Sequence, residues 1–352
     1  MKQFFVGFSK WGLSLIQHFF PDGEKRIVSN LQELIKFGVD KDSYVYMYPA
    51  KEDFEIRKYC EENGIKVFLV EDGFIRSLSL GSSFFKPASI VIDSRGIYFD
   101  PSRESDLEYI LNNYEFDERL IKRAKKLIKL ILENKISKYN HLEDKVIQIP
   151  KNKNIKLVIG QVDDDMSIKL GGYGFNSLKL LKTVKENSNK DDFIIYKPHP
   201  DVVAGIRTGL VDEKNLYNYC DLIVKDASLD SCFKVSNEVH TITSLSGLEA
   251  LLRGKKVFTY GMPFYAGWGL TNDFRECKRR KRKLNLYELI AATYILYPKY
   301  RSLKTLKEST PEEILMEIKE LRDKYFHNLL FKLKINVLGK SAVILRKVRD
   351  FI

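Results

Sequence analysis

Acidic side chains follow two strongly apolar runs of this sequence, in positions where they can take part in chemistry. Glu71 and Asp72 come directly after the run IKVFLV, and three consecutive aspartates occupy residues 163–165, shortly after the run IKLVIG. A carboxylate on a rigid support at the end of a strand is well placed to act as a general acid or base. The alternative for Glu71 and Asp72 is a solvated turn or a helix cap.

The aspartate triplet at residues 163–165 is compatible with three interpretations. Neighbouring carboxylates repel one another, a cost that proteins tolerate for a cation or for catalysis. The first interpretation is a magnesium site, because hard cations prefer carboxylate oxygens. The second is a carboxylate nucleophile that captures a sugar covalently and so preserves its anomeric configuration. The third is a polar cap at the start of a helix.

The motif KPHP, which contains Lys197 and His199, follows the apolar run DFIIY. The prolines on both sides of His199 restrict its backbone and present the imidazole beside Lys197. An ammonium and an imidazole offer two hydrogen-bond donors to a phosphate group. The alternative is that His199 is an ordinary surface histidine.

Hydroxyl side chains precede a short helical pattern that ends near Gly254. Ser244 and Ser246 fall at the expected N-terminus of this helix, where free backbone N–H groups and partial positive charge attract anions. Glu249 lies about one turn further along and is placed to bind a ribose hydroxyl. Alternatively, Ser246 and Glu249 form a capping box.

The stretch YGMPFYAGWGL, residues 260–270, is too irregular for a core strand and too apolar for an ordinary loop. We expect it to close the nucleotide side of a cleft, with Tyr260 in the wall and Gly261 allowing close approach of the backbone. An aromatic plug between two domains is the alternative, and both can hold together.

Strands that alternate with helices are needed to position these residues. Apolar runs predict strands at residues 2–9, 43–49, 65–72 and 89–94, with helices at 51–63, 104–113 and 117–137. After a polar stretch at 138–154, further strands are predicted at 155–160, 192–200, 221–226 and 255–261. Two rounds of this alternation predict an α/β fold with parallel sheets in two Rossmann-like domains that face a cleft. The motif residues follow strands, at the carboxyl ends where such sheets bind ligands.

Composition excludes several classes of protein. No apolar run approaches the roughly 18 residues of a membrane span, and the N-terminus lacks a signal cleavage site, so we expect a cytoplasmic protein. Four cysteines without paired spacing argue against a zinc site or a disulfide framework. No nucleic-acid-binding motif and no GxGxxG turn of a dehydrogenase occurs.

The formal net charge of +12 is concentrated in two regions. Residues 278–283 read KRRKRK, and residues 324–352 carry seven lysines and arginines, interleaved with apolar side chains, against the single acid Asp350. An amphipathic basic tail favours an anionic membrane surface; the alternative is a helix packed on the fold with a solvated basic face. The KRRKRK run is expected to be exposed or to attract an anionic polysaccharide.

Taken together, the motifs resemble those of KpsC-type capsule-synthesis proteins. The segments EDGFIRSLSLG, IVIDSRGIYFD, QVDDDMS, YKPHPD and SLSGLEALLRGKKVFTYGMPFYAGWGLT, followed by ILYPKY, carry the resemblance in this order between about residues 60 and 300. Such proteins are retaining β-Kdo transferases that use CMP-Kdo and start the linker between capsular polysaccharide and a phospholipid. They often contain two transferase modules, whereas this chain has one copy of each motif.

The resemblance implies a role for each motif residue. Asp165 would be the nucleophile that captures Kdo, and Glu71 the acid/base that deprotonates the acceptor hydroxyl. The residues that would hold the donor are Lys197, His199, Ser244 and Ser246 at the phosphate, Glu249 at the ribose, and Gln161 and Ser167 in the pocket. Because these groups and a helix N-terminus supply positive potential, we expect neither a metal nor another cofactor, and rank the magnesium interpretation below the nucleophile.

The resemblance also implies an organisation and a set of partners. We expect a GT-B-type glycosyltransferase with an acceptor-side domain at residues 1–150, a CMP-sugar-binding domain at 151–305 and a helical basic tail at 306–352. The expected partners are CMP-Kdo, a lipid-linked Kdo or phospholipid acceptor, an anionic membrane surface and other capsule-assembly enzymes, but not nucleic acid. The protein would then be peripheral at the inner membrane.

Two other functions remain as alternatives. One is transfer of another CMP-sugar, such as sialic acid, by the same chemistry. The other is a non-catalytic module for polysaccharide export or binding, against which the intact Glu71, Asp165, His199 and Ser246 argue.

Overall fold

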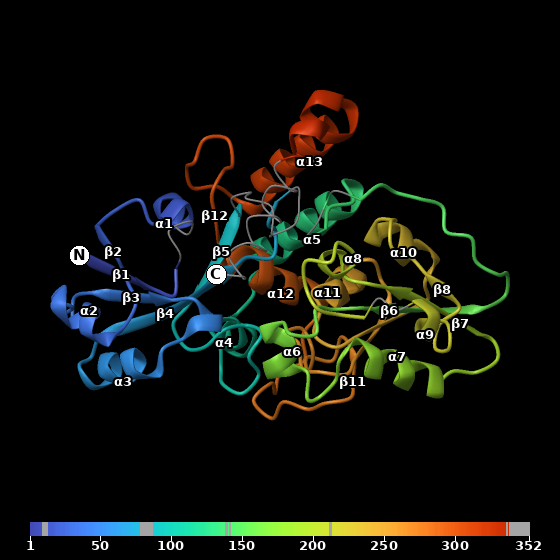
Figure 1. The fold of residues 1–352 in the computed structure, drawn as a ribbon, viewed down its shortest axis with the longest axis horizontal. Helices are drawn as coiled ribbons and strands as arrows, with labels where there is room; N and C mark the ends of the chain where they lie inside the picture. Colours follow the sequence, from blue (N-terminus) through green and yellow to red (C-terminus); the bar gives the residue numbers. More distant parts are fainter. Residues whose placement is uncertain are drawn as a thin grey trace.

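Two sheets of six strands each form the framework of the protein (Figure 1). The computed structural model describes residues 1–8, 13–77, 87–137, 140, 142–210, 213–335 and 337, and all statements on the structure refer to these. The first sheet is built mainly from the N-terminal third of the chain, and the second from residues 154–273.

The first sheet has the strand order β12-β5-β4-β3-β1-β2. Four of its strands are parallel, namely β1 (Lys2–Val6), β2 (Glu24–Val28), β3 (Tyr44–Met47) and β4 (Lys66–Asp72). The helices between them are α1 (Leu13–Phe19), α2 (Leu31–Lys36) and α3 (Phe54–Glu62), with the short 3-10 helix η2 (Pro49–Lys51) ahead of α3. The expectation of a wholly parallel sheet is wrong here, because β5 (Ser89–Asp93) runs antiparallel to β4, and β12 (Pro298–Tyr300) antiparallel to β5.

The second sheet is entirely parallel, with the order β11-β10-β9-β6-β7-β8. Its strands are β6 (Asn154–Ile159), β7 (Asp192–Lys197), β8 (Leu222–Ile223), β9 (Glu238–Thr241), β10 (Lys256–Thr259) and β11 (Asn272–Asp273). The helices are α6 (Met166–Gly171), α7 (Ser177–Glu186), α8 (Pro200–Val203), α9 (Glu213–Leu216), α10 (Leu229–Val235) and α11 (Ser246–Leu252). Buried aliphatic side chains of β6 and β7 form the centre of this half, since both faces of a doubly wound sheet are covered.

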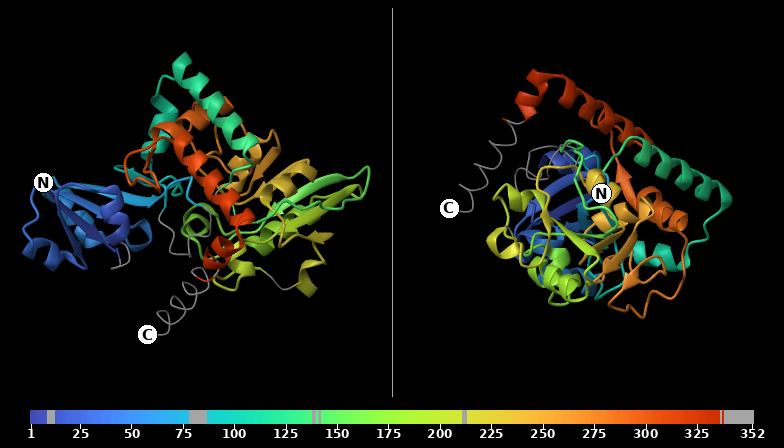
Figure 2. Two further views of the ribbon diagram at one scale, coloured as in Figure 1. Left: turned by 90° about the horizontal axis from the view of Figure 1, so that it is seen from above. Right: turned by 90° about the vertical axis from the view of Figure 1, so that its right-hand side faces the viewer.

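A group of helices covers the junction of the two halves. It comprises α4 (Asp106–Asn113), α5 (Glu118–Glu133), α12 (Leu286–Ile290), the π-helix η3 (Ala291–Leu296) and α13 (Pro311–His327). Figure 2 shows α5 and α13 side by side along this junction. The chain returns to the first sheet at β12, which pairs with β5. This return comes before residue 305, the predicted end of the CMP-sugar-binding domain.

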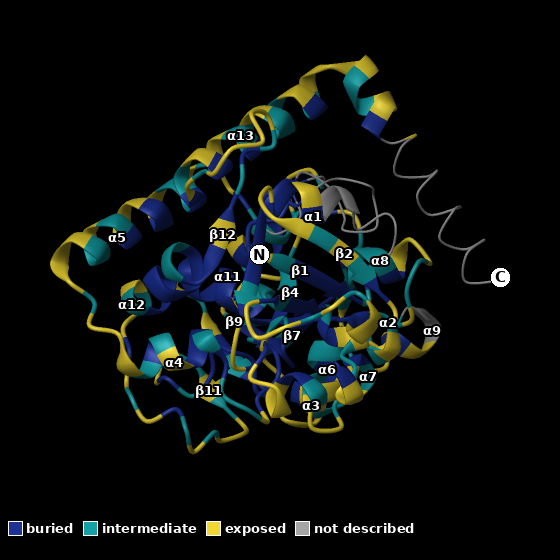
Figure 3. Ribbon diagram, turned by 90° about the vertical axis from the view of Figure 1, so that its left-hand side faces the viewer, coloured by how far each residue is buried: buried dark blue, intermediate teal, exposed yellow. Residues whose placement is uncertain are grey.

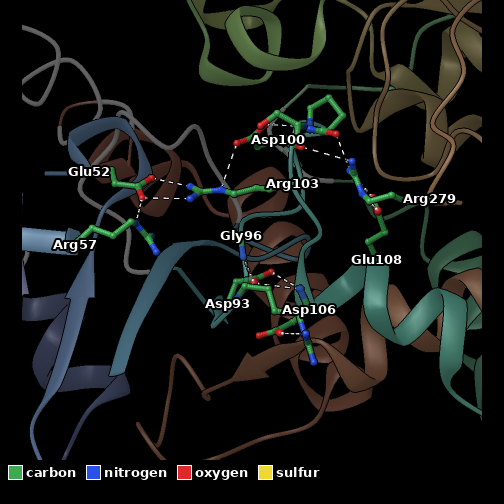
Figure 4. Close-up of polar contacts among 12 residues, drawn as sticks. Glu52, Arg57, Asp93, Gly96, Asp100, Arg103, Asp106, Glu108 and Arg279 are labelled. Atoms are coloured by element: carbon green, nitrogen blue, oxygen red, sulfur yellow. Dashed lines mark hydrogen bonds and ion pairs between the residues drawn. The ribbon is translucent and has the colours of Figure 1, made fainter. Parts of the chain in front are cut away.

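The basic run at residues 278–283 is partly a structural clamp rather than a free cationic surface. Arg279 and Arg280 both bind the buried carboxylate of Glu108 on α4, with N–O distances of 2.6 and 3.1 Å. Figure 4 shows the contact between Arg279 and Glu108. Arg280 also donates to the backbone oxygens of Pro263 and Ala266, at 2.6 and 2.7 Å. The clamp therefore ties α4 to the aromatic loop at residues 260–270.

Figure 4 also shows how the segment after β5 is held. The buried Asp93 accepts hydrogen bonds from the backbone N–H groups of Gly96 and Asp106. It also accepts one from the Tyr297 hydroxyl at 2.7 Å. Burial raises the pKa of Asp93, although these donors oppose the shift. This carboxylate of the IVIDSRG motif thus organises a turn and belongs to the framework.

Candidate functional site

A cavity of about 970 Å³ lies between the two halves, and most of the predicted site residues line it. The residues that line it are Glu71, Gln161, Asp165, Ser167, Lys197, His199, Ser244, Ser246 and Glu249, together with neighbours from both halves. Glu71 comes from the first sheet, Lys197 is the last residue of β7, and the others follow β6, β7 and β9 of the second sheet. The carboxyl ends of parallel strands meet at one edge, which explains why motifs distant in sequence share one cavity.

The three consecutive aspartates have three different partners. Asp163 accepts hydrogen bonds from the backbone and hydroxyl of Ser177, and Asp164 pairs with Arg207 at 3.1 Å. Asp165 caps α6, where its Oδ1 accepts from the backbone N–H of Ser167 at 2.9 Å and from the Ser167 hydroxyl at 2.7 Å. Within the described residues, no group of three or more histidine, cysteine, aspartate or glutamate side chains is arranged to hold a metal ion.

Glu71 stands at the end of β4 beside a tyrosine that the sequence did not single out. The Tyr48 hydroxyl donates to Glu71 Oε1 at 3.1 Å, and the Asp72 backbone N–H donates to the same oxygen at 2.9 Å. The charge of Glu71 and burial hold the pKa of Tyr48 well above its usual value, so the hydroxyl remains a donor at neutral pH. Tyr48 directly follows the neighbouring strand β3, which is the signal that places it at the same edge.

Lys197 and His199 both line the cavity, but their polar atoms are already partly engaged. The buried Lys197 ammonium donates to the backbone oxygens of Lys225 and Ala227, at 3.0 and 2.8 Å, and burial lowers its pKa. Two of its three protons are therefore used by the protein. His199 Nδ1 accepts the backbone N–H of Asp201 at 3.1 Å, which leaves the proton of a neutral ring on Nε2.

The helix α11 begins at Ser246, within the segment predicted for its N-terminus, but without the alternative capping box. Leu245 occupies the cap position with helical dihedral angles and no side-chain cap, so the capping box between Ser246 and Glu249 does not form. Instead the Ser244 hydroxyl accepts the backbone N–H of Ser246 at 3.2 Å. Glu249 is 4% exposed and lines the cavity.

The described lining of the cavity does not include Tyr260 and Gly261, so their predicted place in the nucleotide wall stays a prediction. Tyr260 is buried, contacts His240 Nδ1 through its hydroxyl at 3.2 Å and stacks on Phe274. Gly261 makes room for protein atoms, because a Cβ there would lie 2.4 Å from the Gly171 carbonyl oxygen.

The rest of the aromatic loop acts as a plug between the halves. Phe264 lines the cavity and also packs on Phe74 of the first half, with ring centroids 4.9 Å apart. Tyr265 and Trp268 are fully buried behind it, and the Trp268 indole donates to the Phe264 carbonyl oxygen at 2.8 Å.

Three further cations that were not predicted from the sequence line the cavity, namely Arg76, Lys169 and Arg207. Arg76 pairs with Asp72 at 2.6 Å. Arg207 pairs with Asp164, and its hydrogen bond contributes to a lowered pKa of that aspartate against the opposing effect of burial. Lys169 is exposed one helical turn after Asp165 and has no ion-pair partner among the described residues. Its spacing from Asp165, four residues along a helix that begins at an aspartate cap, is the signal that places it there.

A family model described as capsule polysaccharide biosynthesis protein matches residues 45–300. The chain belongs to this family. It is 41% identical over 323 residues to the capsule polysaccharide modification protein LipA of Neisseria meningitidis serogroup A, an alignment that covers 90% of this chain and 46% of LipA. The lipopolysaccharide-processing protein LpsZ of Rhizobium meliloti is 41% identical over 248 residues, which is 69% of this chain and 56% of LpsZ. The chain thus spans about half the length of these relatives.

Two solved structures of KpsC from Thermosulfurimonas dismutans have the same fold as this capsule protein. The β-Kdo 2,7 transferase superposes with a TM-score of 0.76 at 34% identity and covers 92% of this chain and 100% of its own. The β-Kdo 2,4 transferase gives a TM-score of 0.77 at 29% identity, with coverage of 90% and 97%. The predictions of a KpsC-type capsule protein and of two Rossmann-like halves are confirmed.

Proposed function

We propose that this capsule protein transfers Kdo from CMP-Kdo to a saccharide acceptor with retention of configuration. The observation that carries the proposal is that Glu71 from the first half and Asp165 from the second line one cavity with a set of polar groups suited to a nucleotide. The solved structures with the same fold are Kdo transferases, which supports the choice of donor.

The proposed reaction is a double displacement. A carboxylate oxygen of Asp165 forms a bond to the anomeric carbon of Kdo while the bond to the CMP phosphate breaks and its electron pair stays on the phosphate. Glu71 then takes the proton of the acceptor hydroxyl, whose oxygen displaces the Asp165 carboxylate. Two inversions at the same carbon retain its configuration.

The leaving phosphate is proposed to be stabilised by protein groups alone. The Nε2–H of His199, the remaining proton of Lys197 and the first turn of α11 supply donors on one side of the cavity. We therefore expect that dialysis against EDTA leaves the rate of CMP release unchanged, and loss of activity that magnesium restores would contradict this part of the proposal.

The decisive experiment is intact-protein mass spectrometry after incubation with freshly prepared CMP-Kdo. The native chain is expected to gain the mass of one Kdo residue with release of CMP, and Asp165→Asn to gain none. Asp164→Asn is the matched control, because Asp164 is bound to Arg207, and it should still form the adduct. Glu71→Gln should form the adduct but fail to pass it to an acceptor. Absence of both adduct and CMP release in the native chain would refute the proposal, and CMP-sialic acid would be the next donor tested.

We also propose that the helical segment after α13 binds an anionic membrane surface. Residues 329–335 are helical, and Ile335 and Phe331 on one face pack with Tyr325 at the end of α13. The exposed apolar side chains on the other face are Leu329, Leu330, Leu333 and Val337, at 71%, 79%, 51% and 60% exposure. At about 100° per residue these four fall within an arc of about 100°.

The partner that suits this outer face is anionic lipid. In Figure 3 the ribbon beyond the end of α13 includes segments coloured as exposed. Lys334 in this segment is also exposed. The sequence after it, residues 338–352, adds Lys340, Arg346, Lys347 and Arg349 against one acid and lies outside the described residues. Apolar insertion and basic charge together are the combination that holds a helix at a membrane interface. No helix of the described residues is long and apolar enough to cross a membrane.

Binding to vesicles tests this part of the proposal. The protein should sediment with phosphatidylglycerol vesicles and less with phosphatidylcholine vesicles, and Leu329→Ser with Leu330→Ser should abolish most of the binding. Val146→Ser is the control, because Val146 is an apolar residue that is 95% exposed and far in sequence from the tested segment. The double variant should still release CMP from CMP-Kdo at the native rate. Binding of the double variant equal to that of the native chain would refute the assignment.

A further inference from the structure

A row of hydrogen bonds with one direction runs from Gln161 to Asp165. Gln161 Nε2 donates to Thr243 Oγ1 at 3.1 Å, and the Thr243 hydroxyl donates to Ser167 Oγ at 3.2 Å. The Ser167 hydroxyl donates to Asp165 Oδ1 at 2.7 Å. The row begins at the end of β6, passes through the segment after β9 and ends on the cap of α6.

The direction of every proton in this row is determined by one backbone group. The Thr243 backbone N–H can only donate, and it donates to Gln161 Oε1 at 2.9 Å. The amide of Gln161 must therefore present its NH₂ group to the Thr243 hydroxyl, which leaves the threonine proton for Ser167. Ser167 in turn gives its proton to Asp165. Hydrogen bonds aligned in this way strengthen one another.

Packing holds the Thr243 side chain in place. Its methyl group lies against two glycines, since a Cβ on Gly261 would be 2.9 Å from Thr243 Cγ2 and a Cβ on Gly171 would be 3.3 Å from it. Gly171 is the last residue of α6, and its carbonyl oxygen accepts the Met262 backbone N–H at 2.8 Å. Both ends of α6, and with them Asp165, are thereby fastened to the segments after β9 and β10.

The two oxygens of Asp165 are consequently unequal. Oδ1 accepts both the backbone N–H and the hydroxyl of Ser167, whereas no donor among the described residues contacts Oδ2. Hydrogen bonds withdraw electron density from a carboxylate oxygen and make it the weaker nucleophile, so the oxygen without them is the better one to attack.

From this geometry we infer that Thr243 is a positioning residue, which acts through Ser167 to hold Asp165 Oδ1 and so presents Oδ2 to the anomeric carbon. The inference rests on the proposed covalent step. In that step an Oδ2 electron pair forms the bond to the anomeric carbon, the bond from that carbon to the phosphate oxygen breaks, and CMP departs with the electron pair.

The test compares the rate of adduct formation in rapid-quench mass spectrometry. Thr243→Val keeps the shape and the contacts with both glycines but removes the donor to Ser167, and should slow adduct formation about 10- to 100-fold while the donor KM changes less than about threefold. Thr243→Ser should restore the rate to within about threefold of native. Thr293→Val is the matched control, because the buried Thr293 hydroxyl has no hydrogen-bond partner among the described residues, and it should react at the native rate.

Ser167→Ala provides a second, independent measurement and serves alone if Thr243→Val loses its cooperative unfolding transition. It should slow adduct formation similarly, and adding Thr243→Val to it should change the rate no further, because both act through one hydrogen bond on Oδ1. A native rate in Thr243→Val or Ser167→Ala, additive losses, or failure of Thr243→Ser to restore the rate would overturn the inference while the proposed function stands. If the native chain forms no adduct, the proposed function fails first and the inference fails with it.

Discussion

At the scale of residues, the cationic side chains of the cavity differ in how many of their hydrogen bonds and ion pairs are made within the protein. Lys197 gives two protons to backbone oxygens, and Arg207 is paired with Asp164, so neither is wholly available to a substrate. Lys169 is exposed beside Asp165 and has no such partner among the described residues. We therefore expect the Lys169 ammonium, which lines the same cavity as Asp165, to contact an anionic donor.

Lys169→Met is expected to raise the donor KM about tenfold and to change kcat less than about threefold, since loss of a charge-assisted contact weakens binding rather than chemistry. Steady-state CMP release measures both constants. Lys179→Met, an exposed lysine of α7 in the same half, should change neither constant. An unchanged KM in Lys169→Met would show that the donor's charges are bound elsewhere.

Tyr260→Phe is expected to leave kcat and KM unchanged, because Tyr260 lies outside the described lining of the cavity and its hydroxyl contacts His240. The free energy of unfolding should fall by about 1 kcal/mol, the usual net value of one hydrogen bond. Kinetics and urea unfolding of the same preparation separate the two effects. A rise in KM without a loss of stability would show that Tyr260 contacts the donor, as the sequence predicted.

At the scale of elements, the strand ends supply the chemistry and the segments between the halves fix their relative position. The side chains of Glu108 and Arg280 are 4% and 2% exposed, so their ion pair is shielded from water and from salt. Arg280 also holds two carbonyl oxygens of the loop that contains Phe264. Removal of Glu108 would leave a buried guanidinium without its counter-charge.

Glu108→Gln is expected to lower the free energy of unfolding by about 3–5 kcal/mol, the usual cost of leaving one partner of a buried pair uncompensated. Glu118→Gln is the control, because its pair with Lys122 has side chains 82% and 66% exposed; it should cost less than about 1 kcal/mol. Urea unfolding measures both values. Similar losses in the two variants would contradict the role of Glu108 as the anchor of the clamp.

At the scale of the whole molecule, one buried histidine makes folding depend on pH. His240 on β9 is 4% exposed, and its removal from water lowers its pKa although Glu238 lies 3.4 Å away and opposes the shift. The unfolded chain therefore binds this proton more readily than the folded one. The stabilisation is complete above the ordinary histidine pKa of 6.5 and is lost as the pH falls through the lowered value.

Urea unfolding at several pH values between about 8 and 5.5 should show a free energy of unfolding that falls below about pH 6.5, and His240→Gln should reduce this fall. His327→Gln, at an exposed position on α13, should leave the pH dependence as in the native protein. Parallel curves for the native chain and His240→Gln would place the pH dependence in other groups.

The features that could be predicted from the sequence are local ones, such as strands and the residues that follow them. Apolar runs followed within a few residues by Glu71, Asp165 or His199 predict strand ends that carry polar groups. This prediction works because the strand and the polar residue are close in sequence. The patterning does not predict β2 (Glu24–Val28) and β9 (Glu238–Thr241), since their sequences EKRIV and EVHT mix charged and apolar residues. It also does not predict the short strands β11 and β12. β9 nevertheless lies between β10 and β6, where packing rather than propensity decides.

The sequence by itself determined the alternation of strands and helices, the order of the motifs and the chemical groups available at the strand ends. Only the tertiary structure decided what each group contacts: Lys197 with the oxygens of residues 225 and 227, Arg280 with Glu108, and Gln161 with Thr243 and through it Asp165. It also brought β12 back to the first sheet. The physical reason is that periodicity and capping depend on residues within a few positions of one another. Hydrogen-bond partners at a cleft, by contrast, come from segments whose contact depends on the packing of the entire chain.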